Sequence, residues 1–235
     1  MNPIELYLRV REREGRIYTD QVVAHLPDYP DDQALSSEWR SRADSSARLT
    51  SYLSAKKRPL SILELGCGNG WLANRLALIA STHVWGLDRN SRELVQAARV
   101  FTRPNLAFLS ADIFNAPLAE QSFDVIVLAS VIQYFPDLAG LIQALKTLLK
   151  LRGEIHLLDS PLYNPDELPT AQERTQKYYA ALGFPEMSGY YFHHLATDLD
   201  AFSPHWFYLP GNLVARLKRI VGQDISPFPW LVIGK

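Results

Sequence analysis

Three glycines follow a short apolar run in the segment "ILELGCGNGW", and a glutamate interrupts that run. Gly66, Gly68 and Gly70 form a G-x-G-x-G loop, where the missing Cβ atoms let a ligand lie against the main chain. The helix expected after the loop would offer free N–H groups and its positive dipole end to an electron-rich group. Glu64 precedes the glycines within an apolar strand, where an unpaired carboxylate is costly. The segment therefore predicts a ligand site at the end of a buried strand.

Acidic residues also end the next two predicted strands. Asp88 ends the second strand, where a carboxylate can accept hydrogen bonds from two ribose hydroxyls, and Asp112 ends the third. The segment "FDVIVLASVIQYFPD" (123–137) then gives a strand that opens into an aromatic loop. Ligands of parallel sheets bind beyond the carboxyl ends of the strands. We therefore expect these groups to converge at one edge of the sheet.

Strands and helices alternate from residue 60 onward, which is the pattern that must position these residues. Continuous apolar strands separated by amphipathic helices indicate a parallel sheet covered on both faces. The expected strands are 60–66, 82–90, 105–113, 122–131 and 153–161, and the expected helices are 70–80, 91–101 and 138–150.

The two ends of the chain differ from this middle part. Residues 1–57 are interpreted as a helical cover of the same domain, with an amphipathic helix over 36–57. Residues 58–235 form the main domain, with an aromatic insertion at 163–208 that contains a helix over 170–182. We expect the cover and the insertion to exclude water from the site. The remaining predicted elements are strands at 205–210 and 228–235 and a helix at 211–222.

Composition excludes several classes of protein. A formal charge of -1 argues against a protein that grips nucleic acid mainly by its phosphates. The single cysteine, Cys67, excludes an intramolecular disulfide and a cysteine-dominated metal site. The first residues do not resemble a signal peptide, and no stretch approaches the roughly 20 apolar residues of a membrane span. A soluble, cytoplasmic protein with no membrane span is expected.

The glycine loop fits a dinucleotide site poorly. That fingerprint is G-x-G-x-x-G, and Trp71 occupies the position of its third glycine. A nicotinamide-dependent oxidoreductase is therefore a disfavoured alternative, and a non-catalytic nucleoside-binding protein is another.

The combination of these motifs resembles the class I S-adenosylmethionine-dependent methyltransferases. "LELGCGNG" is similar to the first motif of that family, E-x-G-x-G-x-G, and the resemblance covers residues 45–160 well and "FPWLVIGK" more loosely. It implies an α/β fold, a three-layer Rossmann-like sandwich whose seven-stranded sheet is mostly parallel with an antiparallel C-terminal strand. It also implies S-adenosyl-L-methionine as cofactor and S-adenosyl-L-homocysteine as product.

The resemblance further implies which residues bind the cofactor. The glycine loop would wrap the methionine moiety, Asp88 the ribose and Asp112 with Ile113 the adenine, while the fourth strand runs past the sulfonium. The implied set is Glu64, Gly66, Cys67, Gly68, Gly70, Asp88, Arg89, Asp112, Ile113, Ala129 and Ser130. Structural alternatives remain open: Asp88 caps the helix that begins at Ser91, Glu64 binds loop amides, and Cys67 only packs.

Candidates for the acceptor side are fewer. Gln133 and Tyr134 follow the fourth strand, near the transferring methyl group, and Tyr178 and Tyr190 from the insertion complete the candidate substrate-binding set. A base is needed only if the acceptor must lose a proton. The weak candidates for it are Asp159, His193, His194 and His205. No metal site is expected, because adjacent residues such as His193 and His194 point to opposite faces of a strand.

The predicted function is methyl transfer to a small molecule at an undetermined O, N or C atom. Family members that methylate exocyclic amines of nucleobases often carry D/N-P-P-F/Y after the fourth strand. Here that position holds Ala129-Ser130-Val131-Ile132, which disfavours such acceptors. The alternative is an RNA or protein methyltransferase of the same fold. The sequence determines neither the acceptor, the pathway nor the oligomeric state.

Overall fold

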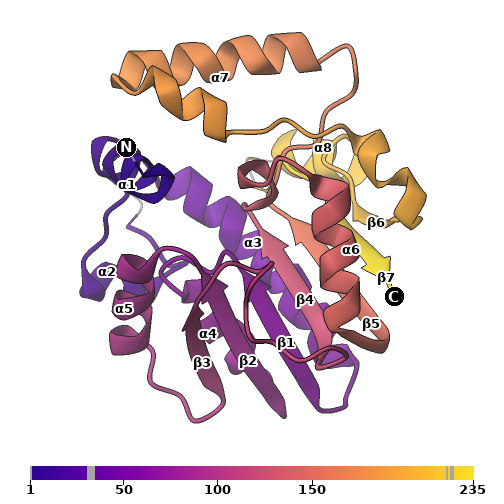
Figure 1. Ribbon diagram of the computed structural model, residues 1–235. Helices are drawn as coiled ribbons and strands as arrows, with labels where there is room; N and C mark the ends of the chain where they lie inside the picture. Colours follow the sequence, from indigo (N-terminus) through magenta and orange to yellow (C-terminus); the bar gives the residue numbers. More distant parts are fainter. Residues whose placement is uncertain (1, 31–34, 221, 223–224) are drawn as a thin grey trace.

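The predicted strands assemble into one twisted sheet at the centre of the molecule (Figure 1). The computed structural model describes residues 2–30, 35–220, 222 and 225–235, and within them seven strands lie in the order β3-β2-β1-β4-β5-β7-β6. Their bounds are β1 (Leu60–Leu65), β2 (Thr82–Asp88), β3 (Leu106–Ser110), β4 (Phe123–Ala129), β5 (Leu149–Leu158), β6 (His205–Tyr208) and β7 (Trp230–Gly234). The order places β4 at the middle of the sheet, with β1 beside it.

Strand directions follow the expected pattern. β1 runs parallel to β2 and β4, and β5 runs parallel to β4. β7 lies antiparallel between β5 and β6. The expected mostly parallel sheet with an antiparallel C-terminal strand is therefore confirmed.

Helices cover both faces of the sheet (Figure 1). Alternate strand residues point to opposite faces: Ile62 packs in one apolar cluster with helices α3 and α4, and Leu63 packs in another with α6. The helices are α1 (Pro3–Arg13), α2 (Asp20–His25), α3 (Ser36–Ala55), α4 (Trp71–Ala77), α5 (Ser91–Val100), α6 (Leu138–Leu148), α7 (Leu168–Leu182) and α8 (Leu213–Ile220). Three 3-10 helices are also described: η1 (Ile132–Tyr134), η2 (Pro185–Tyr190) and η3 (Ala196–Phe202). None of the described helices is long and apolar enough to cross a bilayer.

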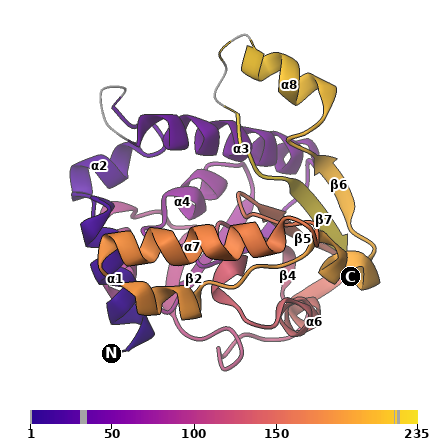
Figure 2. The ribbon, with the colours of Figure 1, turned by 90° about the horizontal axis from the view of Figure 1, so that it is seen from above.

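α1 and α7 lie across the carboxyl ends of the strands, as the view from above shows (Figure 2). A small apolar cluster of its own joins them, with Leu6 and Val10 from α1, Tyr179 from α7 and Met187 from η2. Burying such side chains contributes roughly 1.5–3 kcal/mol each. This cluster holds the two segments as a roof above the strand ends.

Several element boundaries differ from the expected ones. β5 begins at Leu149, because the fully buried Leu149 leaves the helix and pairs with Phe123 across an irregularity in the ladder. β3 ends at Ser110, so Asp112 lies in the following loop. The N-cap of α5 is Asn90 rather than Ser91. The expected helix at 211–222 is observed as α8, with residue 221 outside the described residues.

Candidate cofactor and acceptor site

A cavity of about 490 Å³ opens at the carboxyl ends of β1, β2 and β4, beneath α1. Gly66 and Asp88 line it from the sheet, Tyr7 and Arg11 from α1, and Tyr190 from η2. Volumes of 300–1,000 Å³ are typical of small-molecule sites. The cavity therefore has the size and position expected of a ligand site in a parallel sheet.

The glycine loop forms its floor with bare main chain. Gly66 has a φ of +74°, and a Cβ there would lie 2.2 Å from Cγ2 of Val131. The Gly66 and Cys67 amides both donate to the Leu87 carbonyl, at 2.7 and 3.2 Å, which fixes the loop against β2. Any side chain at Gly66 would displace Val131, which also lines the cavity.

Gly70 has a different role from the other two glycines. It is the N-cap of α4 with a φ of +77°, and a Cβ there would lie 2.7 Å from the Phe108 ring. Gly70 does not line the cavity, whereas Trp71 does. The requirement for glycine at this position thus comes from the packing of α4 on β3 and α5.

Glu64 is the unusual group of the site. Its side chain is 3% exposed, and no described residue hydrogen-bonds to its Oε2 atom. Burial, followed by the nearby charge of Asp88, raises the pKa of this carboxyl well above its usual value. An unpartnered carboxylate oxygen in a ligand cavity fits a cationic ligand group, such as the ammonium of an amino acid.

Asp88, at the end of β2, accepts hydrogen bonds that fix the glycine loop and the start of α5. Its Oδ2 accepts from the Gly68 amide at 2.9 Å, and its Oδ1 accepts from the Asn90 amide at 2.8 Å. Burial raises its pKa, although backbone hydrogen bonds from Asn90, Gly68 and Arg89 oppose the shift. A carboxylate has about four acceptor sites, so it keeps the capacity to accept from a ligand hydroxyl. The cap of α5 is the Asn90 side chain, which excludes the alternative in which Asp88 serves only as that cap.

The other predicted cofactor residues surround this centre. Asp112 accepts from the Phe114 amide at 3.0 Å and lies 3.6 Å from Arg89. The Cys67 thiol is buried, and burial raises its pKa, so it is protonated and packs. Except for Gly70, the whole predicted cofactor set lines the cavity, including Ile113, Ala129 and Ser130.

Two of the predicted acceptor residues line the cavity, namely Tyr134 and Tyr190. Gln133 lies outside the lining and donates from Nε2 to the Ser130 carbonyl at 2.7 Å. Tyr178 is 46% exposed on α7 and donates to Glu14, away from the cavity. The structure therefore places Tyr134 and Tyr190 at the cavity and leaves Gln133 and Tyr178 outside its lining.

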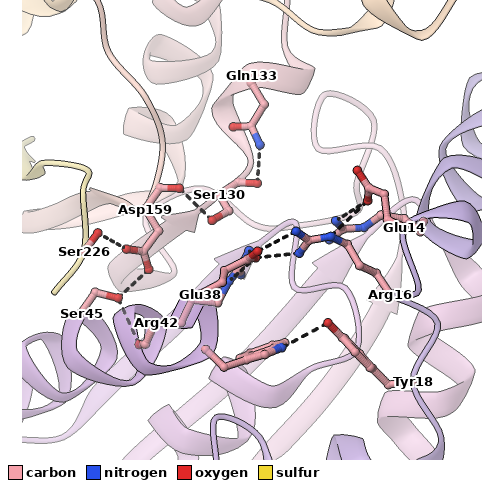
Figure 3. A network of polar contacts seen from close by, with 12 residues as sticks. Glu14, Arg16, Tyr18, Glu38, Arg42, Ser45, Ser130, Gln133, Asp159 and Ser226 are labelled. Carbon is pink, nitrogen blue, oxygen red and sulfur yellow. Dashed lines mark hydrogen bonds and ion pairs between the residues drawn. The ribbon is translucent and has the colours of Figure 1, made fainter. Parts of the chain in front are cut away.

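None of the candidate bases belongs to the described lining. Asp159 is buried and accepts from Ser45 at 2.6 Å and from Ser226 at 2.8 Å, which fastens the end of β5 to α3 (Figure 3). His194 is buried against the Ile132 carbonyl at 3.0 Å. His193 bonds to Thr175, and His205 lies exposed on β6. The structure gives these candidates structural contacts in place of the expected catalytic position.

Sequence reasoning missed the part of the site that comes from the N-terminal segment. Tyr7 and Arg11 lie one helical turn apart on α1, a spacing that puts them on one face. Spacing of that kind is the only signal in the sequence, and it does not say which surface the face meets. Other lining residues that were not predicted include Arg16, Trp39, Arg42, Glu93, Met187 and Phe192.

The strand order, the bare loop after β1 and the acidic residue at the end of β2 together define a class of protein. They are the features of the class I S-adenosylmethionine-dependent methyltransferases, and the predicted fold class is confirmed. A family model described as "Methyltransferase domain" matches residues 56–206. The chain belongs to this family of methyltransferase domains.

Relatives and solved structures agree with the family. A malonyl-[acyl-carrier protein] O-methyltransferase of Legionella pneumophila subsp. pneumophila is 28% identical over 184 residues, covering 73% of this chain and 63% of the relative. A 2-phytyl-1,4-naphtoquinone methyltransferase of Nostoc punctiforme is 30% identical over 112 residues, covering 45% and 49%. The chain spans less than two thirds of the length of the curated relatives it matches.

The similar solved structures share the fold at low sequence identity. The magnesium protoporphyrin IX methyltransferase of Synechocystis PCC 6803 has a TM-score of 0.60 at 16% identity, with 95% of this chain and 93% of that chain covered. The plantazolicin methyltransferase BpumL has a TM-score of 0.57 at 18% identity, with 98% and 99% covered.

Proposed function

We propose that this chain transfers the methyl group of S-adenosylmethionine to a small organic acceptor bound beneath α1 and η2. The observation that carries the proposal is the continuity of the cavity. One space is lined by the carboxylates and bare loop at the strand ends and by Tyr7 of α1, Tyr134 of η1 and Tyr190 of η2. A cofactor and an acceptor can therefore meet within it.

The residues at the strand ends fit this cofactor. The unpartnered Oε2 of Glu64 suits the ammonium of the methionine moiety, and the remaining acceptor capacity of Asp88 suits the ribose hydroxyls. Gly66 leaves the loop bare where the ligand approaches. The bound cofactor supplies an activated methyl group, so the protein must mainly hold the acceptor in line with it.

The roof suits that positioning task. Rings of Tyr7 and Tyr134 meet edge to face with centroids 5.6 Å apart, and Met187 and Phe192 line the cavity beside them. These groups offer apolar contact to an acceptor and exclude water from the reacting atoms. The names of the relatives, which include sterol 24-C-methyltransferase of Neurospora crassa, support a small lipophilic acceptor.

Cofactor binding is tested with Asp88→Ala. We expect the affinity for S-adenosylhomocysteine to fall by about tenfold or more, which is ~1.4 kcal/mol, because the ribose hydroxyls lose their acceptor. Isothermal titration calorimetry measures this affinity. The control is Asp166→Ala, which changes an exposed aspartate outside the cavity. Equal affinities for the two variants would remove Asp88 from the site.

Transfer itself is tested with cofactor radiolabelled in the methyl group. The label is expected in small metabolites of a cell extract, and label found only in RNA or protein would favour the alternative acceptors. A thermal shift with NAD⁺ that exceeds the shift with S-adenosylhomocysteine would favour an oxidoreductase instead.

A further inference from the structure

Three arginines reach the cavity from the N-terminal segment, and two glutamates lie behind them. Arg11, Arg16 and Arg42 line the cavity, whereas Glu14 and Glu38 are not part of the lining. Arg16 binds Glu38 through both terminal nitrogens, at 2.7 and 2.6 Å, and Arg42 binds the same carboxylate at 2.9 Å (Figure 3). The three arginines thus contribute to the cavity lining, and the two carboxylates that pair with them lie outside it.

Within this ladder of Arg11, Arg16, Arg42, Glu14 and Glu38, the arginines outnumber the glutamates that they pair with. The partly buried Glu93, which also lines the cavity, adds a negative charge near Arg11. Glu14 is shared by Arg11 at 3.3 Å and Arg16 at 3.2 Å, and Glu38 is shared by Arg16 and Arg42. Three guanidinium groups therefore divide two carboxylates between them. Arg11 uses Nη1 for Glu14, and a guanidinium has five N–H donors, so donors remain for a ligand.

Arg11 lies beside aromatic side chains that line the cavity. Its guanidinium lies 5.3 Å from the ring centroid of Tyr7, whose ring in turn meets Tyr134 of the loop after β4. Met187 and Tyr190 line the cavity from η2. The charge therefore lies next to the aromatic surface that we assign to the acceptor.

The polar groups at this surface are hydrogen-bond donors. Burial raises the pKa of Tyr7 and of Tyr134, so both phenols stay protonated at neutral pH and can donate. The guanidinium of Arg11, unlike a phenol, can only donate. An acceptor that fits this wall presents oxygen atoms that accept hydrogen bonds, and a negative charge strengthens those bonds.

We propose that the acceptor is an apolar molecule bearing a carboxylate, which Arg11 binds and which is methylated on oxygen. This inference rests on the proposed function. One lone pair of the carboxylate oxygen forms the new bond to the methyl carbon, and the methyl–sulfur bond breaks with its electron pair on sulfur. The products are a methyl ester and a neutral thioether, and no proton moves.

Other acceptor groups suit the same wall less well. A protonated amine is repelled by the arginine ladder and must lose a proton before it can attack. An alcohol must also lose a proton, and the raised pKa of Tyr7 makes that phenol a poor base at neutral pH. A carboxylate is already ionised at neutral pH and is attracted by the ladder.

The bond that is formed can be identified without knowing the acceptor. The wild-type protein is incubated with methyl-labelled S-adenosylmethionine and an organic extract of acidic metabolites, and each labelled product is treated with mild alkali. Methyl esters release labelled methanol, which is collected as vapour, whereas N-methyl, C-methyl and ether products keep their label. The same extract, esterified beforehand with unlabelled methyl groups, serves as the control.

Volatile label that disappears with the esterified extract supports the inference. Alkali-stable label would overturn the inference and leave the proposed function intact. Absence of any labelled product, from acidic, neutral or basic extracts, would overturn both together.

Arg11→Gln tests whether Arg11 binds the carboxylate of the acceptor. We expect the apparent KM for the acidic extract to rise by about tenfold or more, because a charge-assisted hydrogen bond is lost. The affinity for S-adenosylhomocysteine is expected to change by less than about twofold, and Arg11→Lys is expected to restore part of the loss. Arg9→Gln on the exposed side of α1 is the matched control.

A parallel loss of S-adenosylhomocysteine affinity in Arg11→Gln would place Arg11 at the cofactor and overturn its assignment. An unchanged KM would overturn it as well. Circular dichroism spectra of Arg11→Gln and Arg9→Gln, both in the full chain, show whether unfolding causes a change in KM or in affinity.

Discussion

Glu64 occupies a buried position where an ionised carboxyl group is energetically unfavourable. Its carboxyl is buried within β1, and its Oε2 atom has no hydrogen-bond partner among the described residues. Natural sequences break local rules of this kind mainly at functional sites. We therefore infer that Glu64 is present because it binds the ligand, although its burial lowers the stability of the ligand-free protein.

Glu64→Gln tests this conflict. The variant is expected to raise the melting temperature of the ligand-free protein, because the glutamine removes a buried ionisable group. Its affinity for S-adenosylhomocysteine is expected to fall by about tenfold or more, because an amide does not pair with an ammonium. Differential scanning fluorimetry measures the first quantity and calorimetry the second.

The sign of the pH dependence follows from the raised pKa of Glu64 in the folded state. Above the unfolded pKa of about 4.3, ionisation favours the unfolded chain, so wild-type stability falls as the pH rises toward the folded pKa. The stabilising effect of Glu64→Gln should therefore be larger at about pH 8 than at about pH 5. Glu120→Gln at an exposed site is the control. A gain that is the same at both pH values would show that Glu64 is ionised throughout.

The arginine ladder, formed by Arg11, Arg16 and Arg42 with Glu14 and Glu38, is a second feature that depends on individual residues. Each of its glutamates contacts two arginines, so the removal of one glutamate leaves two guanidinium groups with fewer partners. Such networks act as units, in which single substitutions are not additive. Arg11 lies at one end of the ladder, so Arg11→Gln leaves both ion pairs of Glu38 in place and affects only the shared Glu14.

At the level of elements, α1 is held to the rest of the molecule by a small contact. Only Leu6 and Val10 of its described residues are buried, and they pack on Tyr179 and Met187. This cluster is separate from the two large clusters beside the sheet. Elements with few buried apolar contacts open more easily than the core.

Leu6→Ala tests whether the roof opens locally. The substitution removes a fully buried side chain, a change that costs about 2–5 kcal/mol in well-packed cores. We expect hydrogen exchange of α1 amides to accelerate while exchange of β4 amides stays unchanged. Arg9→Ala on the exposed side of α1 controls for helix propensity. Uniform acceleration over α1 and β4 would show that the roof and the sheet unfold as one unit.

At the scale of the whole molecule, the C-terminal strand joins the sheet at an internal position. β7 lies between β5 and β6, and Ile233, which is 0% exposed, pairs with Ile155. The last residues of the chain therefore belong to the core that carries the site.

Ile233→Ala is expected to lower the free energy of unfolding by about 2–5 kcal/mol, because it leaves a cavity in the apolar cluster that packs on the sheet. Leu151→Ala, at a position 81% exposed, is expected to change it by less than about 0.5 kcal/mol. Urea denaturation measures both. Similar values for the two variants would show that β7 contributes little to global stability.

The fold could be predicted to a large extent because local patterns specify it. Apolar strands such as β4 and the glycine that ends β1 fix where the elements begin and end. Boundaries were less accurate at Leu149, where tertiary pairing extended β5 beyond its expected start. The acidic residues at the strand ends could be predicted as neighbours because all parallel strands end at the same edge.

The roof could not be predicted in the same way. Gln133 and Tyr178 were expected at the acceptor, yet one is turned toward the Ser130 carbonyl and the other contacts Glu14 outside the cavity. His193 and His194 lie in irregular chain, where no period indicates the direction of a side chain. Their positions depend on how the insertion packs, which is a non-local contact.

The sequence by itself determined the sheet, the bare glycine loop and the carboxylates beside it, because strand periodicity and backbone freedom are local properties of the chain. Only the tertiary structure decided that α1 folds back over the strand ends and brings Tyr7 and Arg11 into the cavity. The physical reason is that this arrangement depends on buried contacts between segments far apart in the chain, such as Leu6 with Tyr179. No local pattern of residues encodes the partner of such a contact.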